Sequence, residues 1–286
     1  FGGQTAIKLT KFLDDNGIQI LGTSQEGIDT AEDREKFDAL LEKYGFMRPK
    51  GCGVMTLEEA LEAANRLTYP VLLRPSYVIG GQNMTIVHND TEVERYMRKI
   101  LSTGIENPVL VDKYMSGTEI EVDVISDGKD VLIPGIMQHI ERAGVHSGDS
   151  ACIIPSKHIS EENVATIKEY TRKIAEEMHV KGLMNMQYAI ENGKVYVLEA
   201  NPRASRTVPL VSKVCNIRMV PLATDIITSE LTGRPSPVPA LKEQVIPNYG
   251  VKEAVFPFNM FQEVDPVLGP EMRSTGEVLG LSPSFG

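Results

Sequence analysis

Residues 195–206, with the sequence VYVLEANPRASR, constrain the fold of this chain more than any other stretch. The run 195–198 is apolar and rich in β-branched and aromatic residues, which predicts a buried strand. Glu199 and Asn201 follow two positions apart, so on an extended chain both side chains leave the same face. A carboxylate and an amide oxygen side by side are hard ligands, which suit magnesium better than zinc or copper.

Two arginines, Arg203 and Arg206, lie just beyond these candidate ligands. A guanidinium group can hold anionic oxygens through two parallel hydrogen bonds. Metal ligands followed by arginines predict a site that could move a phosphoryl group. The alternative is a strand end with a solvated polar loop. That alternative is favoured for any one of these residues, whereas the four together favour the functional interpretation.

Composition narrows the class of protein. The chain has 286 residues, which is enough for a large core and for two or more lobes, and no apolar run approaches a membrane span. The formal net charge is −10 and no basic block is present, which argues against a nucleic-acid surface. The three cysteines are far apart, without the spacing of a zinc site or a disulfide framework. We therefore expect a cytoplasmic protein that binds neither nucleic acid nor membrane.

The first 46 residues are typical of the tail of an α/β nucleotide-fold domain with a connecting helix. The chain starts without a methionine or a secretion signal, and a glycine pair opens a helical pattern over 6–13 that Asn16-Gly17 closes. Such a pair normally follows a strand, so we expect a fragment of a longer polypeptide. The pattern then predicts a short strand at 18–21 and a helix at 32–44.

Residues 47–112 predict a small α+β lobe that could close over a ligand. Thr56 and Glu59 form the pattern of a capping box for a helix that runs through Leu67. The other predicted elements are strands at 70–74 and 84–88, and a helix at 91–101 with a buried face of Val93, Tyr96, Met97 and Ile100.

Residues 113–286 predict a larger, mainly antiparallel sheet lobe with a C-terminal extension. Asn192-Gly193 is a typical hairpin turn between two apolar arms, and Ser160 is a good N-cap. From residue 109 onward the predicted elements are strands at 109–112, 119–125, 131–137, 183–190 and 195–200, a helix from Ser160 with a stripe of Val164, Ile167, Ile174 and Met178, and a helix near 221–231 before a proline-rich crossover. The predicted fold class therefore combines α+β and α/β parts.

The hairpin permits one prediction about register. A two-residue loop at Asn192-Gly193 would set Gln187 opposite Leu198, and Gln187 would then face away from Glu199. If Gln187 shares the metal site, either the loop has an odd length or a bulge intervenes. We predict an odd loop, Asn192-Gly193-Lys194, which places Gln187 beside Glu199.

Two stretches ahead of the hairpin could meet a nucleotide. Arg74 ends an apolar strand just before the Gly80-Gly81 loop, where backbone amides and a guanidinium group could meet a phosphate; a structural turn explains these glycines about equally well. The connection 112–119, DKYMSGTE, could offer backbone groups to an adenine edge and Glu119 to a ribose hydroxyl. On spacing alone, an ordinary hairpin loop is the better interpretation of that connection.

Residues 139–150, HIERAGVHSGDS, are unusual for a connection because they hold two histidines, two acids and an arginine. His146 could touch a nucleotide or bond within its own loop. A catalytic triad is a poor interpretation of Ser147 and Asp149, because no nucleophile-elbow pattern surrounds either residue.

Seven motifs of the chain occur together in one known family. They are GGQT, AEDR, VLLRPSYVIGG, HIERAGVHSGDS, GLMNMQ, LEANPRASRTVP and GPEMRSTGEV. In these motifs the chain resembles, over essentially its whole length, the large chains of carbamoyl-phosphate synthases, which belong to the ATP-grasp family. The resemblance implies an ATP-grasp fold with ATP between a small mobile lobe and a larger sheet lobe. The segments 206–209 and 269–278 are similar to the C-terminal of two homologous synthetase halves, which phosphorylates carbamate.

The resemblance also implies roles for the matched residues. The implied nucleotide contacts are Arg34 and Arg74 at the phosphates, Gly80 and Gly81 in the closing loop, Lys113 and Met115 at the adenine, Glu119 at the ribose, and Gly144, Val145, His146, Ser147, Gln187 and Glu199 in the rest of the pocket. The implied ligands of magnesium or manganese, two ions in all, are Gln187, Glu199 and Asn201. Arg203 and Arg206 are implied to hold the reacting anion, and potassium is implied near Glu141.

Two residues depart from the family's pattern. Gln138 stands where a glutamate is expected, which lowers the negative charge near the implied potassium site. Ala200 stands where valine is usual. Neither change removes an implied ligand.

The predicted activity is transfer of the γ-phosphoryl group of magnesium–ATP to carbamate, which gives carbamoyl phosphate and ADP for arginine and pyrimidine synthesis. The implied partners are carbamate, an N-terminal synthetase half and a glutaminase small chain. One alternative is another ATP-grasp ligase that activates a different carboxylate, and a second is a nucleotide-binding regulatory module without turnover. A dinucleotide-dependent oxidoreductase ranks last, because no GxGxxG follows a strand.

Overall fold

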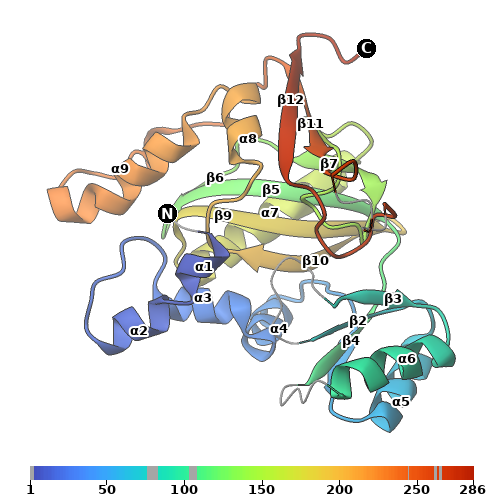
Figure 1. Cartoon of the computed structure of the whole chain (residues 1–286). Coiled ribbons are helices and arrows are strands. Elements are labelled where there is room, and N and C mark those ends of the chain that lie inside the picture. The colour runs from blue at the N-terminus through green and yellow to red at the C-terminus, as the bar shows by residue number, and fades with distance from the viewer. Residues whose placement is uncertain (1–2, 76–82, 103–107, 244, 261–262, 264–265) are drawn as a thin grey trace.

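The strands of the chain build two antiparallel sheets in the computed structural model, which describes residues 3–75, 83–102, 108–243, 245–260, 263 and 266–286 (Figure 1). A four-stranded sheet has the order β1-β4-β2-β3, and an eight-stranded sheet has the order β10-β9-β5-β7-β8-β11-β12, with β6 paired to β5. The two sheets lie side by side, with helices packed against both.

Within the described residues, four helices precede β1, and they differ from three predictions. Their bounds are α1 Gln4–Ile7, α2 Thr10–Asp15, α3 Gln25–Glu32 and α4 Arg34–Lys43. The helix predicted at 6–13 is divided between α1 and α2. The strand predicted at 18–21 is wrong: Ile18 and Leu21 are about half exposed, and without a neighbouring strand or burial a four-residue segment is not held extended. The helix predicted at 32–44 is interrupted at Asp33, whose carboxylate caps α4 by accepting from the Lys36 backbone N–H at 3.0 Å.

The small sheet carries α5 and α6 on one face (Figure 1). The bounds are β1 Gly51–Val54, α5 Leu57–Leu67, β2 Val71–Pro75, β3 Thr85–Val87, α6 Asp90–Leu101 and β4 Val109–Lys113. The capping box predicted at Thr56 and Glu59 is confirmed, with both reciprocal hydrogen bonds present. The predicted buried face of α6 is confirmed too, since all four of its residues lie in the core of this sheet.

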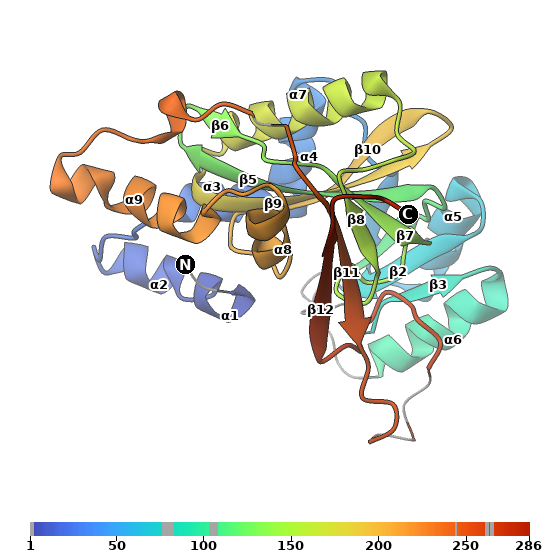
Figure 2. The same cartoon turned by 90° about the horizontal axis from the view of Figure 1, so that it is seen from above.

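The large sheet is covered on both faces. Its elements are β5 Thr118–Asp127, β6 Val131–Leu132, β7 Met137–Arg142, β8 Cys152–Ile154, α7 Glu161–Glu177, β9 Lys181–Glu191, β10 Lys194–Asn201, α8 Val208–Val214 and α9 Met219–Thr232. α7 lies on one side, and α8 and α9 lie on the other (Figure 2). Ser160 caps α7 by accepting from the Asn163 backbone N–H, as predicted. The strand predicted at 131–137 is divided into β6 and the start of β7, and α8 was not predicted.

The central strand β5 shows how the sheet divides chemically. The side chains that face α4 and α7 are apolar, and they are Ile120, Val122 and Val124. The side chains between them point to the opposite face, and they are Glu119, Glu121, Asp123 and Ile125. Ile125 packs in the core that α8 and α9 cover. The second face is therefore apolar under these helices and acidic beyond them.

The β9–β10 hairpin decides the register prediction. Glu191 pairs with Lys194, so the loop has two residues and the predicted odd loop is wrong. The register instead shifts between Val197 and Glu199, which makes Leu198 a bulge and sets Glu199 opposite Gln187. The Val197 N–H donates to Met47 O at 2.8 Å, so an outside segment binds the strand beside the bulge. The predicted placement of Gln187 beside Glu199 is thus confirmed, but a bulge produces it and not an odd loop.

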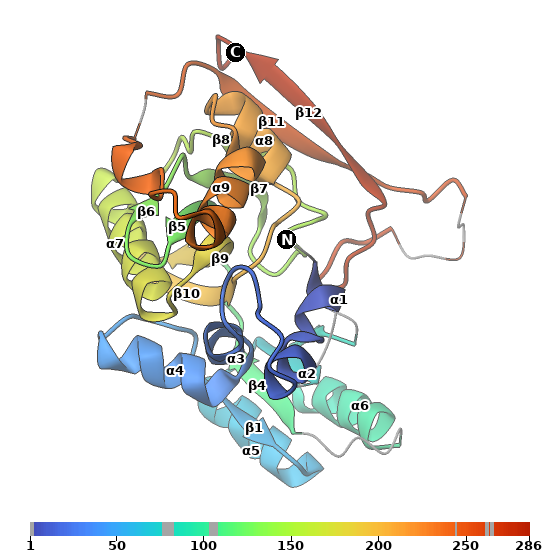
Figure 3. The same ribbon diagram turned by 90° about the vertical axis from the view of Figure 1, so that its left-hand side faces the viewer.

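The C-terminal part adds a long hairpin at the edge of the large sheet (Figure 3). It follows the short helix Val238–Ala240 and consists of β11 Tyr249–Val255 and β12 Gly276–Ser282. β11 pairs with β8, which joins the hairpin to the rest of the sheet. In the part of the chain that the structure describes, no helix combines the length and apolarity that a membrane crossing requires.

Candidate functional site

The three candidate metal ligands lie together on the acidic face of the large sheet. Gln187 is paired with Glu199 across β9 and β10, and Asn201 Nδ2 donates to Glu199 Oε1 at 2.9 Å. Gln187 Nε2 donates to Ser147 Oγ at 3.0 Å. The bulge therefore brings one carboxylate and two amides to one face, and the Gln187 contact attaches the loop of residues 139–150 to the same place.

The loop of residues 144–147 is held from two sides. Ser147 O accepts from Lys252 Nζ at 2.9 Å, and Lys252 is 1% exposed on β11. The His146 N–H donates to Gly269 O at 2.8 Å, which ties the loop to the C-terminal segment. Burial lowers the pKa of His146, so this imidazole is neutral at neutral pH. Sequence reasoning did not identify Lys252, because a lysine in a strand pattern is normally taken as exposed.

Arg203 and Arg206 lie in the connection between β10 and α8. The Arg203 N–H donates to Asn201 O at 2.7 Å, and Arg203 Nη2 donates to Asn201 Oδ1 at 3.3 Å. Arg206 is exposed, with Nη1 at 3.4 Å from Ser274 Oγ. The backbone of both arginines therefore lies just beyond the end of β10, next to the candidate metal ligands.

A stripe of buried acids occupies the centre of this face, and sequence reasoning recognised only its first member. Glu119, Glu121 and Asp123 are 4%, 4% and 1% exposed. Asn185 Nδ2 donates to Glu121 Oε1 at 2.7 Å and to Asp123 Oδ1 at 2.9 Å. The available signal was the alternation EIEVD in a strand, which places acids on one face and apolar residues on the other.

The buried acids differ in protonation because their partners differ. Burial raises the pKa of Glu119 to about 7 and, together with the charge of Glu121, that of Asp123 to about 6. Burial also acts to raise the pKa of Glu121, but the hydrogen bond and charge of His139 outweigh it and lower this pKa. His139 Nε2 lies 3.1 Å from Glu121 Oε2, and this contact and the acids' charges raise the histidine pKa against its burial. His139 and Glu121 therefore form an ion pair.

The two arginines predicted at the phosphates meet at one carboxylate that sequence reasoning missed. Arg34 Nη2 lies 2.6 Å from Asp112 Oδ1, and Arg74 Nε lies 3.1 Å from Asp112 Oδ2. A Cβ on Gly51 would overlap Asp112 Oδ1 and approach Arg34 Nη2 to 2.7 Å, so the cluster needs a glycine at that position of β1. Arg34 begins α4, whose apolar face packs in the core of the large sheet. The Arg34–Asp112 pair therefore links the two sheets.

The residues predicted at the adenine differ in their surroundings. Met115 is 7% exposed and packs in a small apolar cluster with Ala143 and Ala189. The Lys113 N–H, which could have met an adenine edge, is already donated to Lys50 O at 2.7 Å. Lys113 Nζ donates to Thr68 O at 2.9 Å. Of the two, Met115 lies where an apolar ring could be covered.

Gly144 is the predicted pocket glycine whose place the structure explains best. Its φ is +98°, and a Cβ would overlap the ring of Tyr114. Val145 follows it in the same loop, half-buried. Gly80 and Gly81 lie outside the described residues.

The two departures from the family pattern have local explanations. Gln138 Oε1 accepts the backbone N–H groups of Lys157 and His158, both at 3.1 Å, so an amide oxygen satisfies this position. Ala200 packs in the core on the α7 side. Nearby, within the described residues, the buried atoms Glu141 Oε2 and Ser150 Oγ have no hydrogen-bond partner.

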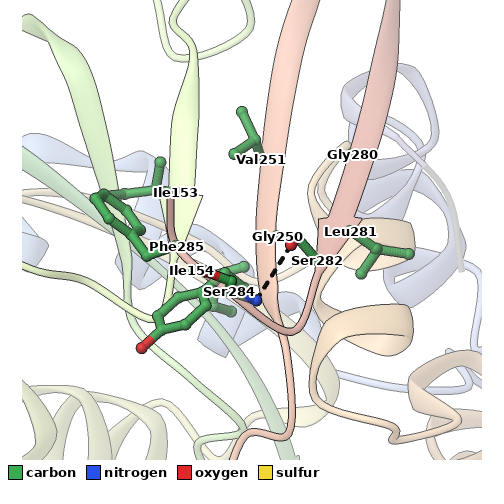
Figure 4. A pocket seen from close by; sticks show the side chains of 10 residues that line it. Ile153, Ile154, Gly250, Val251, Gly280, Leu281, Ser282, Ser284 and Phe285 are labelled. Atoms are coloured by element: carbon green, nitrogen blue, oxygen red, sulfur yellow. Dashed lines mark hydrogen bonds between the residues drawn. The ribbon is translucent and has the colours of Figure 1, made fainter.

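A small apolar pocket lies apart from these residues, at the C-terminal hairpin (Figure 4). Its volume is about 250 Å³, and its lining includes Ile153, Tyr249 and Phe285. None of the predicted site residues lines it. The acidic face of the large sheet is therefore the better candidate for the site.

The donor set fits a hard cation. Among the residues that the structure describes, no three histidine, cysteine, aspartate or glutamate side chains come together as a metal-binding group. The candidate ligands are instead one carboxylate and two amides, which supply oxygen donors alone. Such a set fits magnesium, with further coordination left to phosphate oxygens and water.

Comparisons with known proteins point to one family. The model described as "Carbamoyl-phosphate synthase L chain, ATP binding domain" matches residues 33–230. The carbamoyl phosphate synthase large chain of Clostridium beijerinckii is 52% identical over 282 residues, which are 98% of this chain and 26% of the relative. The large chain of Archaeoglobus fulgidus is 50% identical over 288 residues, again 26% of its length. The chain thus spans about a quarter of the curated relatives that it matches.

Solved structures support the fold. The biotin carboxylase of Campylobacter jejuni, in a complex with a β,γ-ATP ligand, superposes with a TM-score of 0.72 at 18% identity. The match covers 87% of this chain and 56% of that one. The predicted ATP-grasp fold, with its α+β architecture, is therefore confirmed.

Proposed function

The chain belongs to the family of carbamoyl-phosphate synthase large chains, and we propose from this that it binds magnesium–ATP and transfers the γ-phosphoryl group to carbamate. The products are carbamoyl phosphate and ADP. The observation that carries the proposal is the bulge at Leu198, which sets Gln187, Glu199 and Asn201 on one face beside the two arginines. The family model itself is that of an ATP-binding domain.

The nucleotide lies between the two sheets in this proposal. Arg34 and Arg74, which meet at Asp112, hold its phosphates. The apolar cluster around Met115 covers the adenine, and Glu119 accepts from the ribose. Proposed with them are the loop glycines Gly80 and Gly81, the backbone carbonyl of Lys113, and the loop residues Gly144, Val145, His146 and Ser147.

Charge neutralisation is the main chemical task of the site. Phosphoryl transfer needs two anionic reactants held in line, with little covalent help from the protein. Magnesium, when bound, neutralises charge on the phosphate oxygens, and Gln187, Glu199 and Asn201 are the residues that would hold it. Arg203 and Arg206 bind the carbamate oxygens.

The proposed step can be tested in both directions in the intact polypeptide. The forward assay measures ADP formed from ATP with carbamate supplied, and the reverse assay measures ATP formed from ADP and carbamoyl phosphate. We expect both activities in the wild type and neither in Glu199→Ala. Turnover with another carboxylate but not with carbamate would assign the chain to a different ligase. Absence of any turnover from this chain's site would instead favour a regulatory nucleotide-binding module.

Potassium is a further part of the proposal. The unpartnered buried oxygens of Glu141 and Ser150 fit a monovalent cation next to the loop of residues 144–147. We expect turnover to be several-fold higher in potassium chloride than in sodium chloride at equal ionic strength. In Glu141→Gln this difference between the salts should disappear; its persistence would place the cation elsewhere.

The biological setting follows from the same family. We propose that the chain works within a large chain that also holds a second synthetase half, with a glutaminase small chain as ammonia source, in arginine and pyrimidine synthesis. The three cysteines are all free thiols, which fits a reducing compartment such as the cytoplasm.

A further inference from the structure

The connection between β10 and α8, residues 202–207, is attached to the sheet at one buried carboxylate. Ser205 Oγ donates to Asp123 Oδ1 at 2.6 Å, and Thr207 Oγ1 donates to Asp123 Oδ2 at 2.6 Å. Asp123 is 1% exposed, at the centre of β5. Because Arg206 stands between these two hydroxyls in the sequence, the attachment fixes the backbone on both of its sides.

Thr207 shows that this attachment takes precedence over local helix stabilisation. It is the N-cap residue of α8, yet its side chain makes no capping hydrogen bond. A threonine at this position ordinarily accepts from a backbone N–H of the first turn. Its hydroxyl lies instead against Asp123 and within 3.1 Å of Glu121 Oε1. The side chain therefore serves the connection between loop and sheet.

The carboxylate at the centre of the attachment is itself rigidly held. Asn185 is the direct neighbour of Asp123 across β5 and β9, and its Nδ2 donates to Asp123 Oδ1 at 2.9 Å. Asn185 is in turn paired with Asn201 across β9 and β10. A buried carboxylate that loses donors pays a desolvation cost, so the hydroxyls are not easily released. Through Asn185 the loop is thus linked to β9 and β10, the strands that carry the candidate metal ligands.

We propose that Asp123 is a positioning residue for the reaction: through Ser205 and Thr207 it fixes the loop so that Arg203 and Arg206 meet the anionic acceptor. The proposal rests on the proposed function, which gives the two arginines that substrate. Misplacing a substrate-holding group by about 1 Å can cost on the order of 10²-fold in rate. The arginines need a fixed backbone because their own side chains are long and rotamer-rich.

The decisive variants change one hydroxyl with little change in shape. Thr207→Val removes the hydroxyl and keeps the branched side chain, whereas Thr207→Ser keeps the hydroxyl and removes a methyl group. In the reverse reaction of the intact polypeptide, we expect Thr207→Val to raise the KM for carbamoyl phosphate about tenfold, since a hydrogen bond to a charged group is lost. The KM for ADP should stay within about twofold, and Thr207→Ser should behave nearly as the wild type.

Two outcomes of that assay would overturn the inference. One is a wild-type KM for carbamoyl phosphate in Thr207→Val. The other is equal impairment of Thr207→Ser and Thr207→Val, which would assign the effect to packing. Thr224→Val is the matched control, because Thr224 is exposed on α9 and, in the hydrogen bonds described, its hydroxyl bonds only to Val220 O of the same helix.

Hydrogen exchange tests the attachment without any turnover. In the ligand-free intact polypeptide, Asp123→Asn and Thr207→Val should each speed exchange of the Arg203 amide about tenfold, and the double variant should add little to either. Unchanged exchange in both variants would refute the attachment. If the loop responds as expected while the wild type turns over no substrate, the proposed function fails and the attachment stands. If the wild type is active and the loop does not respond, the inference alone fails.

Discussion

The two arginine pairs of this molecule are organised by two buried aspartates in different ways. Asp112, on the small sheet, contacts the guanidinium groups of Arg34 and Arg74 directly. Asp123, on the large sheet, contacts the hydroxyls of Ser205 and Thr207 and so holds the loop that carries the other pair. A direct ion pair aims a guanidinium group but offsets its charge before a substrate arrives. Attachment through the backbone fixes the position of the loop rather than that of a guanidinium group.

This difference suits the two proposed substrates. ATP brings several negative charges and its own metal ions, so its phosphates can compete with Asp112 for the arginines. Carbamate carries one charge, so its binding depends more on where the loop presents the two arginines. We therefore predict that a substitution at Asp112 changes the KM for nucleotide, and that a substitution in the Asp123 attachment changes the KM for the acceptor.

The largest expected effect comes from a change at Glu199, the carboxylate among the candidate metal ligands. Glu199→Gln keeps the shape of the side chain and removes the charge that would hold magnesium. We expect the rate of phosphoryl transfer to fall by about 10²-fold or more, in both directions of the reaction. Glu177→Gln is the control, since Glu177 pairs with Lys43 at 2.8 Å where the ends of α7 and α4 meet, and this change should leave the rate unchanged. A Glu199→Gln enzyme with near-normal turnover would separate the metal site from the reaction.

A smaller effect is expected from Asp112→Asn. This variant should change the KM for nucleotide, whereas Thr207→Val should change the KM for carbamoyl phosphate. The neutral amide no longer holds two guanidinium groups, so the KM for ADP and ATP should rise about tenfold while the KM for carbamoyl phosphate stays within about twofold. Asp38→Asn is the control. Asp38 contacts Arg34 at 3.4 Å but lies closer to Arg48, at 2.7 Å, so this variant should change the KM for nucleotide less than Asp112→Asn does. A rise in the KM for the acceptor in Asp112→Asn would contradict this division between the two arginine pairs.

Gly51→Ala tests the contact between Asp112 and Arg34 by sterics alone. The added methyl group would push Asp112 away from Arg34 without altering any charge. We expect a several-fold rise in the KM for nucleotide, with a loss of stability of about 1–3 kcal/mol that thermal unfolding can measure. Gly53→Ala on the same strand is the matched control: its Cβ would come no closer than 3.3 Å, to Pro108 Cβ. Equal effects of the two substitutions would show that β1 simply tolerates no alanine.

The last effect is on the pH dependence of stability rather than on turnover. Burial beside Glu121 raises the pKa of Asp123 to about 6 from an ordinary value of 3.8. The folded state therefore binds a proton that the unfolded state has lost between these values, and the stabilisation from Asp123 declines as pH rises from about 4 to about 6. Asp123→Asn lacks this titration. The difference in Tm between variant and wild type should move in the variant's favour over this range and stay level above it; a constant difference would contradict the assignment.

Local patterns predicted the helices of the small sheet well. The capping box at Thr56 and the buried stripe of α6 depend on residues three and four positions apart, and both are present as predicted. The N-terminal region was predicted less well, because the strand expected at 18–21 has no neighbouring strand in the described residues. A strand needs a partner that sequence periodicity does not supply.

The candidate site was predicted in part. The pattern at Glu199 and Asn201 indicated one face of β10, and the structure places both there beside Gln187. Asp112 and Asp123 were missed, because their partners lie on other elements and single acids in strand patterns carry no local signal. Their assigned roles, and those of the other site residues, stay predictions until the substitutions above are measured.

The amino-acid sequence by itself determined the capping box at Thr56, the buried stripe of α6 and the chemical groups that end β10. These features depend on spacing within one turn or one strand, where neighbours in the sequence are neighbours in space. The tertiary structure alone decided that Leu198 forms a bulge, that two arginines from different elements share Asp112, and that Asp123 holds the loop after β10. Those contacts depend on strand order and on the cost of burying a carboxylate without partners. Both depend on several segments of the chain together, so no single segment predicts them.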